Sequence, residues 1–245
     1  MNGLDLFSGI GGMSIALQEW VRPIAYCEID PYCQGVLLSR MASGALCYAP
    51  IWDDVRTLEF RAEDRLAIDI LYGGFPCQDI SIAGNGKGLE GERSSLFFEI
   101  IRLAKQIKPK FIFIENVPAI TSRGGLRVVK EIASLEYDCR WCVISASSVG
   151  APHKRDRWFF LAHSYSKSRV ETYKDAESKQ IEKAARIRFT RQNRGDISCD
   201  YWQESECPCL GMDDGLPYQL ERAKTLGNAV VPAQAKDAFK ILMGL

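Results

Sequence analysis

Cys77 stands directly behind an apolar run that ends in two glycines and a proline. Residues 67–72 (AIDILY) have the composition of a buried strand, and residues 73–77 (GGFPC) follow it. Ligands of open α/β sheets bind at the carboxyl ends of strands, so a thiol at this point can act as a nucleophile at the rim of a cleft. The alternative is a small buried residue, because a free cysteine is usually a core hydrophobe. The other polar residues at strand ends favour the nucleophile.

A carboxylate and two arginines occupy comparable positions further along the chain. Glu115 follows the fully apolar run 111–114 (FIFI), which predicts a central, parallel strand. If that strand neighbours the one before Cys77, the carboxylate and the thiol face one cleft. Arg155 and Arg157 precede another apolar run and are suited to hold an anion or a carbonyl oxygen. A charged strand edge is the alternative for the two arginines.

The amino-terminal segment predicts a nucleotide site. Residues 8–12 (SGIGG) separate a short apolar strand from a helical stretch, and such a turn presents backbone N–H groups and a helix N-terminus to a ligand. Glycine-rich turns also occur in many α/β proteins without that role. Glu28 lies about 20 residues further on, where an acid commonly binds ribose hydroxyls, although an acid there also favours a following helix N-terminus. Asp54 ends a third short strand and is suited to an adenine amino group.

Length and composition bound the class of protein. The 245 residues are 47% apolar and 25% charged, with 31 Lys and Arg against 31 Asp and Glu, so a nucleic-acid partner needs a local basic face. No uncharged apolar run reaches the ~18 residues of a membrane span. The first residues lack the features of a signal peptide, so we expect a cytoplasmic protein. The nine cysteines follow no framework spacing, and we expect free thiols and no metal site.

Apolar strands alternate with amphipathic stretches along most of the chain. The expected strands are residues 4–7, 23–30, 51–55, 67–72, 111–114, 139–146 and 158–162. The expected helices are residues 13–20, 31–43, 96–107, 126–135, 216–225 and 232–243.

Two stretches depart from this alternation. Residues 82–93 contain four glycines, the composition of a lid over an active site or of a surface loop. Residues 164–194 carry nine Lys and Arg against four Asp and Glu, whereas residues 195–215 carry six acids and neither Lys nor Arg. The predicted division is a catalytic and cofactor-binding domain over residues 1–163, a short unit over 164–215, and a segment over 216–245 that returns to the first domain.

Five motifs, in order and over nearly the whole chain, resemble those of the C5-cytosine DNA methyltransferases. The family's cofactor motif, nucleophile motif, Glu-Asn-Val motif, Gln-x-Arg-x-Arg motif and closing Gly-Asn-x-Val motif resemble residues 5–12 (DLFSGIGG), 74–78 (GFPCQ), 115–117 (ENV), 155–157 (RDR) and 227–232 (GNAVVP). His153 stands where the fourth motif has its glutamine.

This resemblance implies a mostly parallel, doubly wound α/β sheet of the S-adenosylmethionine-dependent methyltransferase type. It implies transfer of a methyl group to C5 of a cytosine that is flipped out of a short DNA sequence, which residues 164–215 would select. Cys77 would bond covalently to C6 of the base, and a buried Glu115 would contact N3 as an acid. Arg155 and Arg157 would orient the site and hold the base carbonyl.

The resemblance also implies the binding residues and partners. Expected contacts to S-adenosylmethionine come from Phe7, Ser8, Gly9, Ile10, Gly11, Gly12, Glu28, Ile29, Asp54, Val55, Pro76, Leu96, Asn228 and Val230. Expected contacts to DNA come from Gln78, Ser81, Arg186, Arg188, Arg191 and Arg194. The expected partner of this monomer is double-stranded DNA and not a membrane, and a cognate restriction endonuclease is left open.

Two other functions have weaker support in the sequence. Methylation of RNA cytosine is one, but the Cys-Phe-Thr signature of the branch that methylates tRNA is not evident. A non-catalytic protein that binds DNA or senses the cofactor is the other. Loss of the cysteine or the glutamate would mark such a protein, and Cys77 and Glu115 are both present.

Overall fold

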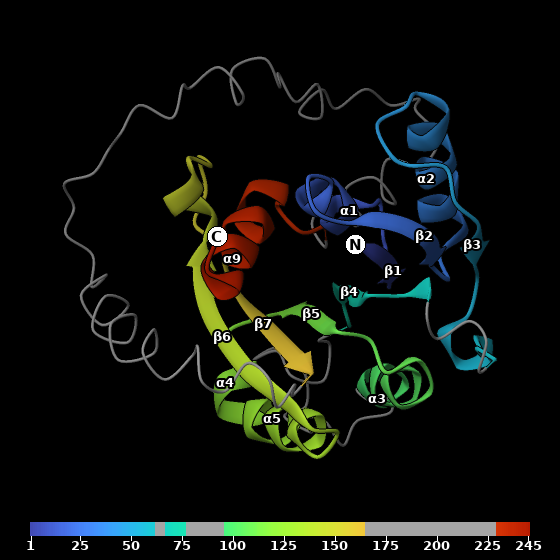
Figure 1. Ribbon diagram of the computed structural model, residues 1–245. Helices are drawn as coiled ribbons and strands as arrows, with labels where there is room; N and C mark the ends of the chain where they lie inside the picture. The colour runs from blue at the N-terminus through green and yellow to red at the C-terminus, as the bar shows by residue number, and fades with distance from the viewer. Residues whose placement is uncertain (62–66, 77–95, 165–228) are drawn as a thin grey trace. The chain divides into compact units, whose positions relative to one another are not determined.

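The computed structural model describes residues 1–61, 67–76, 96–164 and 229–245, which belong to one compact unit (Figure 1). The glycine-rich stretch 82–93, the expected helix over 216–225 and all but the first residue of the unit over 164–215 lie outside the described residues. In chain order the elements are β1 (Asn2–Leu6), α1 (Gly12–Leu17), β2 (Arg22–Cys27), α2 (Pro31–Ala42), β3 (Ile51–Trp52), η1 (Val55–Thr57), β4 (Ile70–Gly74), α3 (Leu96–Ile107), β5 (Phe111–Asn116), α4 (Ile120–Arg123), α5 (Gly125–Ala133), β6 (Tyr137–Ser145), η5 (Ala146–Val149), β7 (Asp156–Ser164) and α9 (Pro232–Met243).

The strands of the described residues form one mixed sheet in the order β3-β2-β1-β4-β5-β7-β6. Neighbours from β3 to β5 are parallel, whereas β7 runs antiparallel to β5 and to β6. The prediction of a mostly parallel sheet is confirmed. β5 is central as expected, but it is parallel to β4 only. Because β7 lies between two strands, Arg157 does not belong to an edge strand.

Helices cover both faces of this sheet, so the doubly wound arrangement is confirmed (Figure 1). Successive side chains of a strand point to opposite faces. Leu71 and Ile112 pack into the cluster that contains α3 and α5. Tyr72 and Phe113, the next residues along the same strands, pack into the cluster that contains α1 and α9.

Helix limits follow the local sequence closely. α3 and α9 have the predicted bounds, and α9 begins at Pro232, where the missing N–H has no intrahelical partner to lose. The third strand is shorter than predicted because the Asp54 carboxylate accepts the Arg56 N–H and starts the 3₁₀ turn η1.

No helix within the described ranges is long and apolar enough to cross a membrane.

β4 continues through Gly73 and ends at Gly74, so the strand predicted over 67–72 includes both glycines before it stops. Backbone approach requires a glycine at Gly73, and a side-chain atom lies close to Gly74. A Cβ atom on Gly73, whose φ is 151°, would lie 1.8 Å from the Leu6 carbonyl oxygen of the neighbouring strand. A Cβ atom on Gly74 would lie 2.7 Å from Oε2 of Glu115. The glycines therefore let β4 run between β1 and the Glu115 side chain.

Candidate active site

A cleft of about 820 Å³ opens where the parallel strands end and β7 begins. This is the edge at which α/β sheets bind ligands. Residues from the amino-terminal turn, from the ends of β2, β4 and β5, and from the segment before α9 line one continuous space. The predicted site residues among them are Phe7, Ser8, Gly9, Ile10, Gly12, Glu28, Ile29, Asp54, Val55, Pro76, Leu96, Glu115, Arg157 and Val230.

The amino-terminal turn presents its backbone to the cleft. The Ser8 hydroxyl donates to the carbonyl of Asp5 at 2.9 Å, and the Ser8 N–H donates to the carbonyl of Cys27 at 3.0 Å, so the turn is anchored to β1 and β2. Gly11 is the N-cap of α1 and does not line the cleft. A Cβ atom on Gly12 would lie 2.9 Å from Cγ1 of Val230, so the chain before α9 packs directly on the turn.

Glu28 is fixed by backbone donors at the end of β2. Its Oε2 accepts the Gly9 N–H at 2.6 Å, and its Oε1 accepts the Asp30 N–H at 2.8 Å. The residue is only 9% exposed. Burial raises the pKa of Glu28, and the two N–H groups act in the opposite direction. Each carboxylate oxygen has a second lone pair, so Glu28 can also accept from a diol in the cleft.

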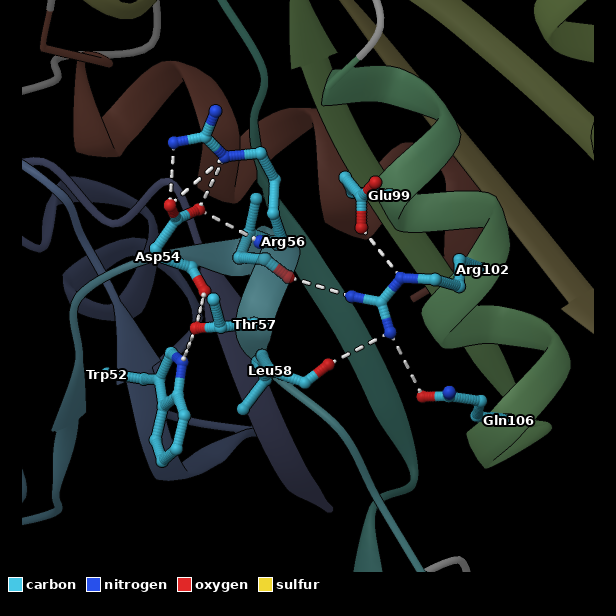
Figure 2. Close-up of polar contacts among 9 residues, drawn as sticks. Trp52, Asp54, Arg56, Thr57, Leu58, Glu99, Arg102 and Gln106 are labelled. Carbon is cyan, nitrogen blue, oxygen red and sulfur yellow. Dashed lines mark hydrogen bonds and ion pairs between the residues drawn. The ribbon is translucent and has the colours of Figure 1, made fainter.

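Asp54 and Arg56 form an ion pair at the β3 end of the cleft (Figure 2). Nη2 of Arg56 lies 2.6 Å from Oδ2 of Asp54, and hydrogen bonds from the guanidinium hold the Asp54 pKa below its usual value. The turn between them is tied to α3, because the Arg102 guanidinium donates to the carbonyls of Val55 and Leu58 at 2.8 and 2.9 Å.

Glu115 and Arg157 form a second ion pair at the β5 end of the cleft. Nε of Arg157 lies 2.8 Å from Oε1 of Glu115, and the two side chains are 18% and 13% exposed, respectively. Burial raises the pKa of Glu115, although the charges of Arg157 and Arg155 oppose that rise. A carboxyl group in this environment retains a proton to a higher pH than a free glutamate does.

Arg155 is placed differently from Arg157. Its Nη2 donates to the carbonyl of Ala229 at 2.9 Å, and Arg155 does not line the cleft. It therefore ties the start of β7 to the segment before α9 and acts on Glu115 through its charge.

Three polar residues to which the sequence assigned no role support the site: Arg56, described above, Asn116 and Gln234. Nδ2 of the buried Asn116 donates to the carbonyl of Phe75 at 3.2 Å, which ties the end of β5 to the chain that leads to Cys77. Nε2 of Gln234 donates to the carbonyls of Ile144 and Arg155 at 2.6 and 2.8 Å. A polar residue behind an apolar strand was a signal for Asn116. Neither Arg56 nor Gln234 had a comparable signal.

Several predicted site residues lie outside the described residues: Cys77, Gln78, Ser81, Arg186, Arg188, Arg191, Arg194 and Asn228. Of the described cysteines, Cys27 and Cys33 line the cleft. Burial raises the pKa of the Cys27 thiol to about 12. Cys27 is therefore a neutral core residue and a poor nucleophile at neutral pH.

Comparison with known proteins points to one family. The sequence model of C-5 cytosine-specific DNA methylases matches residues 1–206. The type II methyltransferase M.CviJI of Paramecium bursaria Chlorella virus IL3A is 32% identical over 237 residues, which cover 96% of this chain and 58% of that protein. The type II methyltransferase M.HhaI of Haemophilus parahaemolyticus is 36% identical over 163 residues, covering 64% of this chain and 47% of that protein.

The fold comparison agrees with this result. The crystal structure of the S. pombe Dnmt2 methyltransferase matches with a TM-score of 0.53 and 24% identity, over 71% of this chain and 55% of that one. At this level of identity the match shows the fold alone. The chain spans about half the length of the curated relatives that it matches.

Proposed function

Because the chain belongs to the family of C-5 cytosine-specific DNA methylases, we propose that it transfers a methyl group from S-adenosylmethionine to C5 of a cytosine in DNA. The observation that carries the proposal is the shared cleft. One space of about 820 Å³ is lined by the glycine turn, Glu28 and Asp54 at one end and by Glu115 and Arg157 at the other. A cofactor site and a base site can therefore adjoin.

The cofactor end fits S-adenosylmethionine chemically. Glu28 is oriented by two N–H groups, which suits it to accept from ribose hydroxyls, and Asp54 can accept from an adenine amino group. When bound, S-adenosylmethionine supplies an electrophilic methyl group on a sulfonium. The backbone of residues 7–10 and the side chain of Val230 would enclose it.

The base end suits activation of a cytosine ring. Cys77 would add as a thiolate to C6, which makes C5 nucleophilic. The raised pKa of Glu115 supports a role as the acid that protonates N3 during this addition. Arg157 would keep the carboxyl group in place and contact the base carbonyl. After methyl transfer, loss of the C5 proton to a base, departure of the Cys77 thiolate and return of the N3 proton to Glu115 restore the neutral aromatic ring.

The described residues support a position for Cys77 at this end. Phe75 and Pro76 leave β4 at the cleft, and Asn116 holds the Phe75 carbonyl beside the end of β5. Pro76 restricts the backbone immediately before the thiol. A base stacked inside a duplex is out of reach of this cleft, so flipping of the target nucleotide belongs to the proposal.

A trapping experiment with 5-fluorocytosine tests the proposal. Fluorine at C5 cannot leave as the proton does, so duplex with 5-fluorocytosine at the target should form a covalent adduct with the wild-type protein in the presence of cofactor. Cys77→Ala should abolish both the adduct and methyl transfer while binding of S-adenosylhomocysteine is kept. Cys47→Ala, at an exposed free cysteine, is the matched control and should form the adduct. An adduct that survives Cys77→Ala would refute the assignment.

We further propose that residues 164–215 select the DNA sequence. The surplus of five positive charges over 164–194 supports phosphate contacts, which give affinity without sequence information. Arg186, Arg188, Arg191 and Arg194 are the candidates for base contacts, because arginine on guanine is the commonest specific contact. Arginine-to-alanine changes should either weaken binding to all DNA or relax the choice of bases. A folded deletion variant that methylates the same sites would contradict this division.

A further inference from the structure

Asp54 is held by its neighbour Arg56 at both carboxylate oxygens (Figure 2). Oδ1 accepts the Arg56 backbone N–H at 3.0 Å and Nε at 2.9 Å. Oδ2 accepts Nη2 at 2.6 Å and shares Nε at 3.0 Å. This fork defines the plane of the carboxylate in a way that a single donor cannot.

The turn that carries the pair is fixed from two other directions. Nε1 of Trp52 donates to the Thr57 hydroxyl at 2.9 Å, and that hydroxyl donates to the Asp54 carbonyl at 3.0 Å. On the opposite side, Arg102 of α3 holds the Val55 and Leu58 carbonyls and is itself held by Glu99 at 2.7 Å. The Arg56 side chain is nevertheless 63% exposed. Hydrogen bonds from Thr57 and Arg102 therefore fix the turn, whereas the fork fixes the carboxylate.

The pair leaves acceptor capacity at the cleft. A carboxylate has about four lone-pair sites, and Arg56 supplies three N–H groups to them, of which that of Nε is shared between Oδ1 and Oδ2. Asp54 and Arg56 both line the cleft. The geometry points to Arg56 as a positioning residue that acts through Asp54, so that the carboxylate accepts from the exocyclic amino group of the cofactor's purine. This inference rests on the proposed function and adds to it a residue and a criterion of selectivity.

The criterion of selectivity is the group at position 6 of the purine, which is either an amino group or a carbonyl oxygen. An ionised, oriented carboxylate attracts a purine that carries an amino group at position 6 and repels one that carries a carbonyl oxygen there, because it has no proton to donate. Hydrogen bonds from the arginine also lower the Asp54 pKa, but an aspartate is ionised at neutral pH with or without them. Without Arg56, Asp54 can rotate, and this loss of orientation weakens the preference.

Calorimetric titration separates this role from direct contact. The ligands are S-adenosylhomocysteine and S-inosylhomocysteine, which differ at that position of the purine. The proteins are the wild type, Arg56→Ala, Arg56→Lys, Asp54→Asn and the double variant. Arg22→Ala is the matched control, because Arg22 is exposed at the start of β2, whereas the cleft lies at the ends of the parallel strands. Circular dichroism confirms that each variant is folded.

We expect Asp54→Asn to raise the Kd for S-adenosylhomocysteine about tenfold and Arg56→Ala about fivefold. Arg56→Lys, which keeps the charge but not the fork, should lie between Arg56→Ala and wild type. The double variant should bind no more weakly than Asp54→Asn alone. S-inosylhomocysteine should bind weakly to the wild type and be unaffected or slightly helped by Arg56→Ala. Arg22→Ala should match the wild type.

Three results overturn the inference. Additive losses in the double variant would mean that Arg56 acts independently of Asp54. An equal loss for both ligands in Arg56→Ala would mean that it contacts the ring or the ribose. Unchanged binding in Arg56→Ala would mean that it has no role. If the wild type bound neither S-adenosylhomocysteine nor S-adenosylmethionine, the proposed function would fall first, and the inference with it.

Discussion

Two carboxylate–arginine pairs lie at the two ends of one cleft, and the pKa values of their carboxyl groups are shifted in opposite directions. In the Asp54–Arg56 pair the closest atoms are 2.6 Å apart, and the side chains are 22% and 63% exposed, respectively. In the Glu115–Arg157 pair they are 2.8 Å apart, and the side chains are 13% and 18% exposed. The pKa of Asp54 is lowered, whereas the pKa of Glu115 is raised. The distance between the charges therefore does not decide the direction.

Burial decides it. Near water a carboxylate keeps most of its hydration, so the hydrogen bonds from Arg56 act almost alone and favour the charged form. At the end of β5 the loss of hydration outweighs the attraction of Arg157 and Arg155. The same pair of chemical groups thus gives a permanent acceptor at one end of the cleft and a carboxyl that holds a proton more firmly at the other. The first suits binding and the second suits acid catalysis.

The largest expected effect is on the pH dependence of stability. It comes from Asp5, a carboxyl whose pKa is raised by burial and not lowered by an arginine. This fully buried carboxyl of β1 accepts the Ser14 hydroxyl at 2.5 Å, and burial raises its pKa from 3.8 to about 7. As the pH rises from 4 to 7, the unfolded chain releases this proton before the folded protein does, so the folded protein loses stability. The Asp5→Asn variant lacks that loss and keeps the acceptor for Ser14. Its stability relative to wild type should rise by roughly 3 kcal/mol between pH 4 and pH 7.

Chemical denaturation across that pH range measures the difference. The matched control is Asp237→Asn on the exposed side of α9, whose stability curve should run parallel to that of the wild type. Parallel curves for Asp5→Asn and wild type would show that Asp5 ionises in the folded protein at its ordinary pKa. Burial would then not decide the pKa of a carboxyl group in this sheet.

The next effect concerns catalysis at the buried pair. Glu115→Gln keeps the shape of the side chain but supplies no acidic proton, so single-turnover methyl transfer should slow by roughly 100-fold or more. Asp54→Asn should instead weaken cofactor binding and keep turnover at saturating cofactor within a few-fold of wild type. Glu19→Gln, in an exposed pair with Lys236, is the control and should be silent. Near-native single-turnover rates in Glu115→Gln would remove the residue from the chemistry.

The smallest effect concerns folding and separates the two arginines. Removal of the exposed guanidinium in Arg56→Ala should move the midpoint of thermal unfolding by about 2 °C or less, because exposed ion pairs contribute little to stability. Arg157→Ala should lower it further, since a buried carboxyl loses its partner. Equal shifts in the two variants would mean that exposure does not distinguish the pairs in the folding equilibrium.

Much of the sheet and its helices was predictable because hydrophobic periodicity is a local property. The apolar run over 111–114 and the pattern over 96–107 gave β5 and α3 directly. The reason for two glycines at the end of β4 was not predictable, because it depends on neighbours from other strands. Gly73 faces the Leu6 carbonyl and Gly74 faces Glu115, and nothing near them in the chain indicates either contact.

The carboxylates of the site were predictable from their positions at strand ends, but their environments were not. Arg56 is two residues from Asp54, yet the sequence does not show that its guanidinium turns back onto that carboxylate. Gln234 contacts residues 79 and 90 positions earlier in the chain. Such contacts depend on how distant elements pack, which periodicity does not encode.

The packing of α9 has a consequence for synthesis of the protein on the ribosome. Phe239 and Leu242 of α9 complete the cluster that holds Met13 and Leu17 of α1, and Val230 closes over Gly12. More than 200 residues separate these partners in the chain. While the intervening residues are being made, one face of the sheet has exposed apolar side chains, which are prone to aggregation or to capture by chaperones. The cleft beside Gly12 is therefore incomplete until α9 has left the ribosome. An intermediate that lacks α9 should bind the proposed cofactor weakly.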